Sequence, residues 1–309
     1  MIYNDVLEAM GHTPIIRLNK LVGPDDAEVL VKYEGVNIGG SIKTRVAYQM
    51  LEAAIKRGDV DPATTIVVEP TSGNQGIGLA LCGAVWGIKV RIIMPDSVSA
   101  ERRKLIKAYG AELVLIHDDG DIGKAIDECL QTAMRMAKED PNVYVPQQFE
   151  NPDNPKAHKF HTALEILEQV GGPIDGFCSG VGTGGTLSGV GAVLKSQNPD
   201  IVIWAVEPEN AAILSGGGVG THLQMGIGDG LIPANLDMDI YENICIISDE
   251  EALDTSRKLA SQEGLMCGIS SGSNVAAALR MARQLGRGKR VVTILPDTGE
   301  RYFSTELFD

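Results

Sequence analysis

Short apolar runs rich in β-branched residues alternate along the chain with longer stretches in which apolar residues recur at helical spacing. Runs of the first kind predict buried strands, and stretches of the second kind predict helices. A regular alternation of strand and helix favours parallel sheets with helices on both faces. The predicted strands are 64–68, 90–94, 112–116, 176–179, 201–206, 244–247 and 291–295, and the predicted helices include 76–86, 100–109, 122–137 and 275–285.

Residues 144–155 break this alternation with prolines and amide side chains. Such a segment is typical of a link between lobes. With 309 residues, of which 44% are hydrophobic and 22% charged, the chain is long enough to form two separate cores. We therefore expect an α/β fold of two lobes with mostly parallel sheets flanked by helices.

The charge balance limits the partners of the protein. The formal net charge is −14 and the pI is ≈ 4.8, so neither nucleic acid nor an anionic membrane is expected as the main partner. A small anionic ligand needs only local donors and is compatible with this charge. Residues 1–5 lack the basic and apolar regions of a signal peptide, and no apolar run is long enough to span a bilayer. We expect a cytoplasmic protein.

Cysteine and histidine spacing gives no sign of a metal site or a disulfide framework. The cysteines form no Cys-x-x-Cys pair, and the histidines show no ligand-like spacing. Reduced structural thiols are therefore expected, without a metal. The cysteines are Cys82, Cys129, Cys178, Cys245 and Cys267, of which the last lies in a Gly-rich stretch.

Three Gly-rich loops follow predicted strands, and ligands in open α/β folds bind outside the carboxyl ends of strands. The first, residues 179–186, can direct backbone N–H groups and threonine hydroxyls towards an anion at a helix start, which predicts a phosphate site. Two alternatives stay open. Gly180, Gly182 and Gly185 match Gly-x-Gly-x-x-Gly and Glu207 ends the next strand, as in a dinucleotide site. The second alternative is a loop whose glycines serve only to let the chain turn.

The second and third loops are richer in side-chain donors. Residues 70–76 offer hydroxyls, amides and N–H groups at a helix start, which suit the carboxylate of an amino or keto acid. A capped turn has the same composition. Residues 268–273 precede an amphipathic run, and a serine N-cap explains them most simply. A serine that contacts a ring nitrogen is the alternative.

Lys43 carries the most distinctive chemistry. Gly39, Gly40 and the N-cap candidate Ser41 precede it, and a helical pattern follows. The N–H groups and positive end of a helix disfavour a cation, so this amine should lose its proton more readily than a solvated lysine. A neutral amine forms a Schiff base with a carbonyl compound, whereas a solvated lysine on a helix is the alternative. A Schiff-base lysine, an anion site, a carboxylate loop and a serine together fit one cofactor, pyridoxal phosphate.

The chain resembles the cysteine synthase (O-acetylserine sulfhydrylase) family of fold-type II pyridoxal-phosphate enzymes, which is related to cystathionine β-synthase. The likeness runs from His12-Thr13-Pro14 to residues 296–302, Pro-Asp-Thr-Gly-Glu-Arg-Tyr. It implies a tryptophan synthase β-like architecture, in which a smaller lobe, 40–145, closes over the bound amino acid. The larger lobe, 1–39 plus 146–309, would bind the cofactor. The resemblance also implies a homodimer and docking of the C-terminus of serine acetyltransferase.

The resemblance implies a role for each matching residue. Lys43 would be the Schiff-base lysine and the proton carrier at the substrate Cα. Asn74 would hydrogen-bond the ring hydroxyl, and Ser270 would face the pyridine nitrogen. Two larger sets complete the site, with the cofactor phosphate held by Gly182, Thr183, Gly184, Gly185 and Thr186, and the substrate carboxylate bound by Thr71, Ser72, Gly73, Gln75 and Gln147.

The implied reaction is β-replacement or β-elimination on a serine-derived amino acid through an α-aminoacrylate, as when O-acetyl-L-serine and sulfide give L-cysteine and acetate. A serine at the ring nitrogen should leave it unprotonated, which favours β-elimination over transamination. A second hypothesis is a non-catalytic module that docks a partner's carboxylate in the 71–75 loop, but retention of Lys43 weighs against it. A third, a nicotinamide-dependent oxidoreductase, leaves Lys43, Asn74 and Ser270 unexplained.

Several positions depart from the family pattern. Gln75 replaces the usual threonine of Ser-Gly-Asn-Thr-Gly, while Ile38 and Thr44 replace a proline and an aspartate near Lys43. Asp229 stands where cysteine synthases typically place a small apolar residue. Its carboxylate is a solvated or capped loop residue, a ligand for a second amino acid, or a general acid or base for a poor leaving group. The last role favours L-cysteine or L-serine as first substrate, so a hydrogen-sulfide-producing lanthionine or cystathionine synthase is the alternative function.

Overall fold

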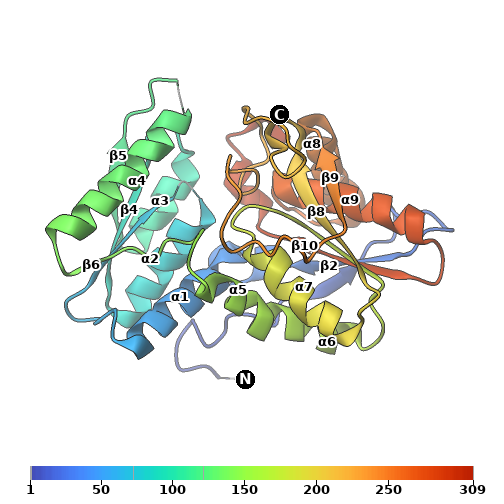
Figure 1. Ribbon diagram of the computed structural model, residues 1–309, viewed down its shortest axis with the longest axis horizontal. Coiled ribbons are helices and arrows are strands. Elements are labelled where there is room, and N and C mark those ends of the chain that lie inside the picture. The colour runs from blue at the N-terminus through green and yellow to red at the C-terminus, as the bar shows by residue number, and fades with distance from the viewer. Residues whose placement is uncertain (1, 72, 121, 309) are drawn as a thin grey trace. The chain divides into compact units, whose positions relative to one another are not determined.

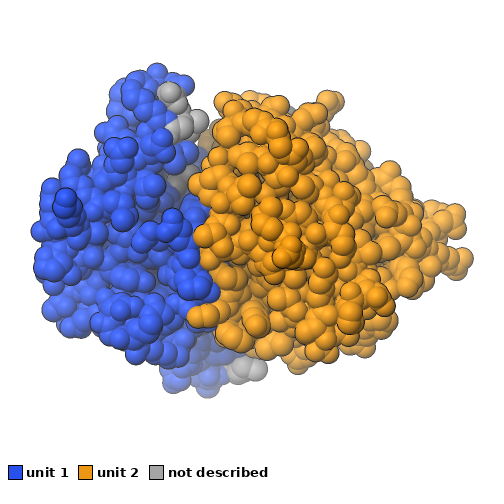
Figure 2. Space-filling view, in the orientation of Figure 1, with its two compact units in different colours: residues 1–10, 43–154 blue, residues 11–42, 155–309 orange. Residues whose placement is uncertain are grey.

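The computed structural model describes residues 2–71, 73–120 and 122–308, and Figure 1 shows its ribbon. The chain divides into two compact units, which Figure 2 distinguishes by colour. Unit 1 comprises Met1–Met10 and Lys43–Asn154, and unit 2 comprises Gly11–Ile42 and Pro155–Asp309. The sequence placed the smaller lobe at 40–145, and its closure over a substrate stays a prediction.

Unit 1 is built on a four-stranded parallel sheet in the order β5-β4-β3-β6. Successive residues of β4 face opposite sides of this sheet. Ile93 packs with Cys129 of α4, whereas Ile92 lies beside Gly76 of α2 and Ile106 of α3, so helices cover both faces. The elements are α1 (Lys43–Arg57), β3 (Ile66–Pro70), α2 (Asn74–Trp86), β4 (Lys89–Pro95), α3 (Ala100–Ala108), β5 (Glu112–Ile116), α4 (Ile122–Glu139) and β6 (Val143–Tyr144).

Unit 2 contains a six-stranded sheet in the order β1-β2-β10-β7-β8-β9, parallel except for the edge pair β1 and β2. Cys178 of β7 and Met281 of α9 belong to the core on one face, whereas Phe177 of β7 and Leu187 of α7 belong to the core on the other. The strands and α-helices are β1 (Ile15–Arg17), β2 (Glu28–Tyr33), α6 (Ala163–Val170), β7 (Gly176–Gly180), α7 (Gly185–Gln197), β8 (Val202–Pro208), β9 (Asn243–Ile247), α8 (Asp249–Lys258), α9 (Ile269–Leu285) and β10 (Arg290–Leu295), with a π-helical turn (His158–Thr162) before α6. Helix α5 (Asp153–Ala157) contains the chain boundary between the two units.

The predicted fold class is confirmed, because both units contain mostly parallel sheets with helices on both faces. Every predicted strand has a counterpart, and the predicted strand 112–116 coincides with β5. Among the described residues, none of the helices combines the length and the apolarity that crossing a membrane requires.

Candidate cofactor and substrate site

Helix α1 begins at Lys43, so this lysine occupies the first helical turn, as predicted. The segment before it turns through Gly39 and Gly40, whose φ angles of 77° and 70° suit glycine. Ser41 lies two residues before the helix and forms a β-bridge with Asp297. Ser41 therefore pairs with a distant segment of the chain. It does not occupy the position directly before the helix, which is the position of an N-cap residue.

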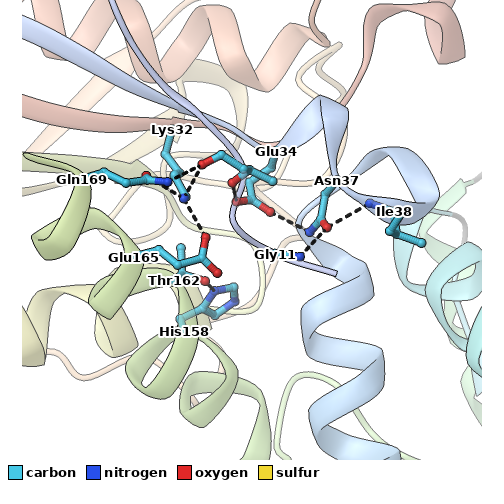
Figure 3. Close-up of polar contacts among 10 residues, drawn as sticks. Gly11, Lys32, Glu34, Asn37, Ile38, His158, Thr162, Glu165 and Gln169 are labelled. Atoms are coloured by element: carbon cyan, nitrogen blue, oxygen red, sulfur yellow. Dashed lines mark hydrogen bonds and ion pairs between the residues drawn. The ribbon is translucent and has the colours of Figure 1, made fainter. Parts of the chain in front are cut away.

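A buried polar network holds the start of this turn within unit 2, as Figure 3 shows. The Lys32 ammonium donates to the Thr13 carbonyl oxygen at 2.6 Å and to the Glu165 carboxylate at 2.7 Å. The Thr13 hydroxyl donates to Glu34 at 2.6 Å, and the Asn37 amide donates to the same carboxylate at 2.9 Å. Because each buried charge has partners, the network fixes the backbone between β2 and Lys43.

The C-terminal motif supports the same turn. The N–H of Thr298 donates to the Gly40 carbonyl oxygen at 3.2 Å, and the Arg301 guanidinium donates to the Gly39 carbonyl oxygen. On its other side the motif holds the start of α9, because a Cβ atom added to Gly268 would lie 2.2 Å from a carboxylate oxygen of Asp297. One segment, 296–302, thus positions both the turn that precedes Lys43 in the chain and the helix that carries Ser270.

The first Gly-rich loop joins β7 to α7 through a tight backbone path. A Cβ atom on Gly182 would lie 2.3 Å from the carbonyl oxygen of Gly226, so any side chain would displace one of the two loops. The N-cap residue of α7 is Gly184, with a φ of 78°, which has no side chain to cap the helix. The first N–H groups of α7 therefore suit an external anion, and the loop fits the phosphate of pyridoxal phosphate.

Two residues that sequence reasoning missed hold this loop. The Asn274 side-chain oxygen accepts the N–H of Gly180 at 2.6 Å, and its amide donates to the Ile294 carbonyl oxygen at 2.8 Å. Buried His158, in the π-helical turn, places its Nε2 atom 3.4 Å from the hydroxyl of Thr186. Both are distant in sequence from the loop, and no local pattern singles them out.

Asp229 lies beside the phosphate loop. One of its carboxylate oxygens is 3.4 Å from the position that a Cβ atom on Gly182 would take, and the N–H of Gly228 donates to the Val181 carbonyl oxygen at 3.0 Å. By contrast, buried Glu207 accepts the N–H groups of two loop residues and a serine hydroxyl. Because these partners occupy its carboxylate, Glu207 is not available as the ribose ligand of a dinucleotide site.

In unit 1 the second loop leads from β3 into α2, whose N-cap residue is Gly73. The Thr71 hydroxyl accepts the N–H of Gly73 at 3.2 Å. Gln75 is buried, and neither polar atom of its side chain has a hydrogen-bond partner among the described residues. An orphaned buried amide at a helix start fits a carboxylate ligand. The predicted contact of Ser72 lies outside the described residues.

The other predicted residues of unit 1 lie near this loop. A Cβ atom on Gly78 of α2 would lie 3.0 Å from the Lys43 carbonyl oxygen, so the start of α1 packs on α2 one turn after Asn74. Gln147 donates its N–H to Glu69 at the end of β3 at 3.0 Å. Unit 1 thus brings Lys43, Thr71, Gly73, Asn74, Gln75 and Gln147 onto neighbouring elements.

The third loop corrects one interpretation. The N-cap residue of α9 is Gly268, whereas Ser270 is the second residue of the helix and is buried. The serine N-cap interpretation is therefore wrong for this loop. All three helices that follow the Gly-rich loops, α2, α7 and α9, begin after a glycine N-cap. A glycine at the N-cap has no side chain that could accept a hydrogen bond from the first N–H groups of the helix, as serine, threonine, asparagine or aspartate would.

The described residues contain no group of three or more His, Cys, Asp or Glu side chains arranged to hold a metal ion. All five cysteines are buried and carry free thiols. Burial raises the pKa of the Cys267 thiol to about 12, with a smaller contribution from the charge of Asp297, so this residue is an unreactive neighbour of the third loop at neutral pH.

Comparison with known proteins shows where the chain belongs. The profile of the family described as pyridoxal-phosphate dependent enzyme matches residues 6–297. A cysteine synthase of Staphylococcus aureus strain N315 is 47% identical over 306 residues, covering 99% of this chain and 97% of that protein. A solved cysteine synthase of Entamoeba histolytica has a TM-score of 0.94 and is 39% identical, covering 100% of this chain and 91% of that one. A solved hydrogen sulfide-producing enzyme of Fusobacterium nucleatum has a TM-score of 0.92 and is 38% identical, covering 98% of this chain and 99% of that one. The chain therefore belongs to the pyridoxal-phosphate-dependent enzymes and, among them, to the cysteine synthase family.

Proposed function

We propose that the protein is a cysteine synthase that converts O-acetyl-L-serine and sulfide to L-cysteine and acetate. The observation that carries this proposal is the position of Lys43 at the start of α1, packed against the helix that follows the Thr71 to Gln75 loop. A lysine in this position suits covalent attachment of a carbonyl compound. The neighbouring loop suits the carboxylate of an amino acid.

The donor set fits pyridoxal phosphate. Gly182, Thr183, Gly184, Gly185 and Thr186 would hold its phosphate at the start of α7, and Lys43 would attach its aldehyde carbon. Asn74 would bond its ring hydroxyl, and buried Ser270 would face its ring nitrogen. When bound, the cofactor supplies an electron sink next to the Cα of the amino acid.

The remaining chemistry belongs to side chains of the protein. The Lys43 amine would take the proton from the substrate Cα and return it at the end of the reaction. The Ser270 hydroxyl is a neutral partner, so it would not keep a positive charge on the ring nitrogen and would favour loss of the Cβ group over transamination. Thr71, Gly73, Gln75 and Gln147 would orient the substrate carboxylate, together with Ser72.

Replacing the lysine tests this proposal. The protein is loaded with pyridoxal phosphate and supplied with O-acetyl-L-serine and sulfide, and L-cysteine is measured by chromatography. Lys43→Ala should abolish turnover, because both the attachment point and the proton carrier are lost. Lys56→Ala is the matched control, since Lys56 lies on the same helix and makes an exposed ion pair with Glu52. Full activity of Lys43→Ala would refute the assignment.

A second candidate function rests on Asp229. Its carboxylate lies beside Gly182 of the proposed phosphate loop, where a general acid would assist a leaving group that departs poorly. L-cysteine would then be the first substrate, with release of hydrogen sulfide and formation of lanthionine, or of cystathionine when homocysteine adds. The solved hydrogen sulfide-producing enzyme of Fusobacterium nucleatum, 38% identical, supports this alternative.

Assembly and location complete the proposal. We propose that the protein works as a cytoplasmic homodimer. Residues 40–145 would close over the bound amino acid. The 71–75 loop would dock the C-terminal carboxylate of a serine acetyltransferase. Sedimentation equilibrium tests the dimer, and small-angle scattering with and without amino acid tests closure. Competition between O-acetyl-L-serine and a C-terminal peptide of the acetyltransferase tests docking.

A further inference from the structure

Glu69 is a fully buried carboxylate in unit 1 to which the proposed reaction assigns no role. It is the next-to-last residue of β3, two positions before Thr71, and only 1% of its surface is exposed. One carboxylate oxygen accepts the N–H of Gln147 at 3.0 Å, and the other accepts the N–H of Gln148 at 3.1 Å. Two consecutive N–H groups that converge on one anion form an arrangement that favours a negative charge.

This contact holds Gln147 in an uncommon conformation. Its φ of 56° lies in the left-handed region, which a residue with a side chain rarely adopts without support. The Gln147 carbonyl oxygen accepts the N–H groups of Glu150 and Asn151 at 3.0 and 2.9 Å, so the residue opens a tight turn. The turn leaves the Gln147 side chain exposed, whereas Gln148 is buried. Glu69 therefore fixes the backbone from which an accessible amide side chain projects.

We infer that Glu69 is the positioning residue that sets Gln147 against the Thr71 to Gln75 loop, so that both bind one substrate carboxylate. The loop continues the strand that carries Glu69, and Gln147 is held by the side chain of the same residue. One residue thus determines the spacing between the two elements. This inference rests on the proposed function, because it assumes that an amino acid carboxylate binds there.

The electrostatics of Glu69 agree with a positioning role. Burial raises the pKa of this carboxyl to about 7, while the N–H groups of Gln148 and Gln147 and the charge of Lys43 act in the opposite direction. Burial of a carboxylate is unfavourable unless its oxygens are satisfied. The two backbone donors offset part of this cost, and they are the same contacts that hold the turn at Gln147.

Unit 2 provides a matched control for this contact. Glu207 is also the next-to-last residue of a parallel strand, is followed by a proline and is buried. Its two carboxylate oxygens accept the N–H groups of Leu214 and Ser215, at 2.9 and 3.0 Å. Replacing either glutamate by glutamine removes one acceptor from a buried pair of N–H groups. The two variants therefore share a structural defect and differ in which loop loses its support.

The test compares Glu69→Gln with Glu207→Gln in the pyridoxal-phosphate-loaded protein. Hydrogen exchange read by mass spectrometry should show about tenfold faster exchange of the peptide containing residues 147 and 148 in Glu69→Gln only, as expected for one lost hydrogen bond. The KM for O-acetyl-L-serine should rise about tenfold while kcat changes much less, because a binding contact is weakened. Glu207→Gln should leave this KM unchanged.

An unchanged KM in Glu69→Gln, or equal rises in both variants, would overturn the inference. If Glu69→Gln does not fold, Glu69→Asp replaces it, since the shorter carboxylate keeps the charge but loses reach and should give the same KM rise in a milder form. Absence of turnover by the wild-type protein with O-acetyl-L-serine, L-cysteine and L-serine would count against the proposed function instead. The exchange comparison would still decide whether Glu69 holds the Gln147 turn.

Discussion

The carboxylate of Asp229 faces Gly182, with one oxygen 3.4 Å from the position that a Cβ atom on the glycine would take. The two residues belong to loops that approach each other through backbone, since Gly182 also lies against the Gly226 carbonyl oxygen. An acidic side chain beside a proposed phosphate site is unfavourable for anion binding alone. Asp229 is exposed, so a solvated loop residue and a role towards the substrate are the two alternatives to be tested.

Replacing Asp229 tests that role. Asp229→Asn should lower turnover from L-cysteine and L-serine at least about tenfold more than turnover from O-acetyl-L-serine, because acetate departs without proton assistance. Sulfide release and chromatography of the products measure the three reactions. Asp239→Asn, an exposed residue later in the same segment, is the control. Equal losses with all three substrates would remove the argument for leaving-group assistance.

A methyl group on Gly182 should weaken cofactor binding. Gly182→Ala places a Cβ atom 2.3 Å from the Gly226 carbonyl oxygen, so the phosphate loop must shift. We expect the affinity for pyridoxal phosphate to fall at least about tenfold, a loss of roughly 1.4 kcal/mol. Titration followed by the visible absorbance of the bound cofactor measures the loss. Gly218→Ala should bind normally, because a Cβ atom there meets no atom within 4 Å.

The pKa of Glu69 predicts how stability depends on pH. Burial raises this pKa from 4.5 in the free carboxyl to about 7 in the folded protein, so the folded state binds the proton more tightly. The contribution of Glu69 to the free energy of unfolding is therefore largest below pH 4.5 and falls as the pH rises to about 7. Each unit of pKa difference corresponds to about 1.4 kcal/mol.

Urea unfolding of the wild-type protein and Glu69→Gln across this pH range measures the effect. As the pH rises, the unfolding free energy of the wild-type protein should fall relative to that of Glu69→Gln. A difference that is independent of pH would contradict the raised pKa.

Among the lysines of unit 2, Lys32 should lower the free energy of unfolding most when it is replaced. Its side chain is 0% exposed, and Lys32→Met would remove the cation that contacts the Glu165 carboxylate at 2.7 Å, which is itself only 10% exposed. Removing one partner of a buried ion pair costs about 3–5 kcal/mol. Lys258→Met, in an exposed pair with Asp254, should cost at most about 1 kcal/mol. Urea unfolding compares the two, and similar losses would show that the network of Figure 3 is not stabilising.

Local patterns predicted β3, β4, β5, β7, β8, β9 and β10, because most of these strands are short runs rich in β-branched residues. They missed β2, which carries Glu28 and Lys32 within its apolar run, and the short strands β1 and β6. The start of α9 was harder. The amphipathic pattern predicted a helix from residue 275, whereas the helix begins at Ile269. The four residues after Ile269 are Ser270, Ser271, Gly272 and Ser273, which carry no apolar periodicity. For the same reason a serine N-cap was predicted for residues 268–273, although the N-cap residue is Gly268.

Long-range contacts could not be predicted from one sequence. Glu69 and Gln147 are 78 residues apart, and the contact is made by the backbone N–H of Gln147, which leaves no residue-type signature at position 147. His158 and Thr186 are 28 residues apart and meet because a π-helical turn presents the imidazole. The Gly-rich loops were found because their chemistry is local, whereas the residues that hold them in place are not.

The three glycine N-caps have a consequence for the lifetime of the protein. A serine or aspartate in place of each glycine typically stabilises a helix by only about a few tenths of a kcal/mol. Helices α2, α7 and α9 forgo the side-chain hydrogen bond of such a cap, and ligands that occupy their N-termini would supply the missing interactions. Ligand binding then raises the melting temperature by mass action. The fraction of chains that resist proteolysis should accordingly rise with the concentration of pyridoxal phosphate. A shortage of this cofactor would then reduce the amount of enzyme as well as its activity.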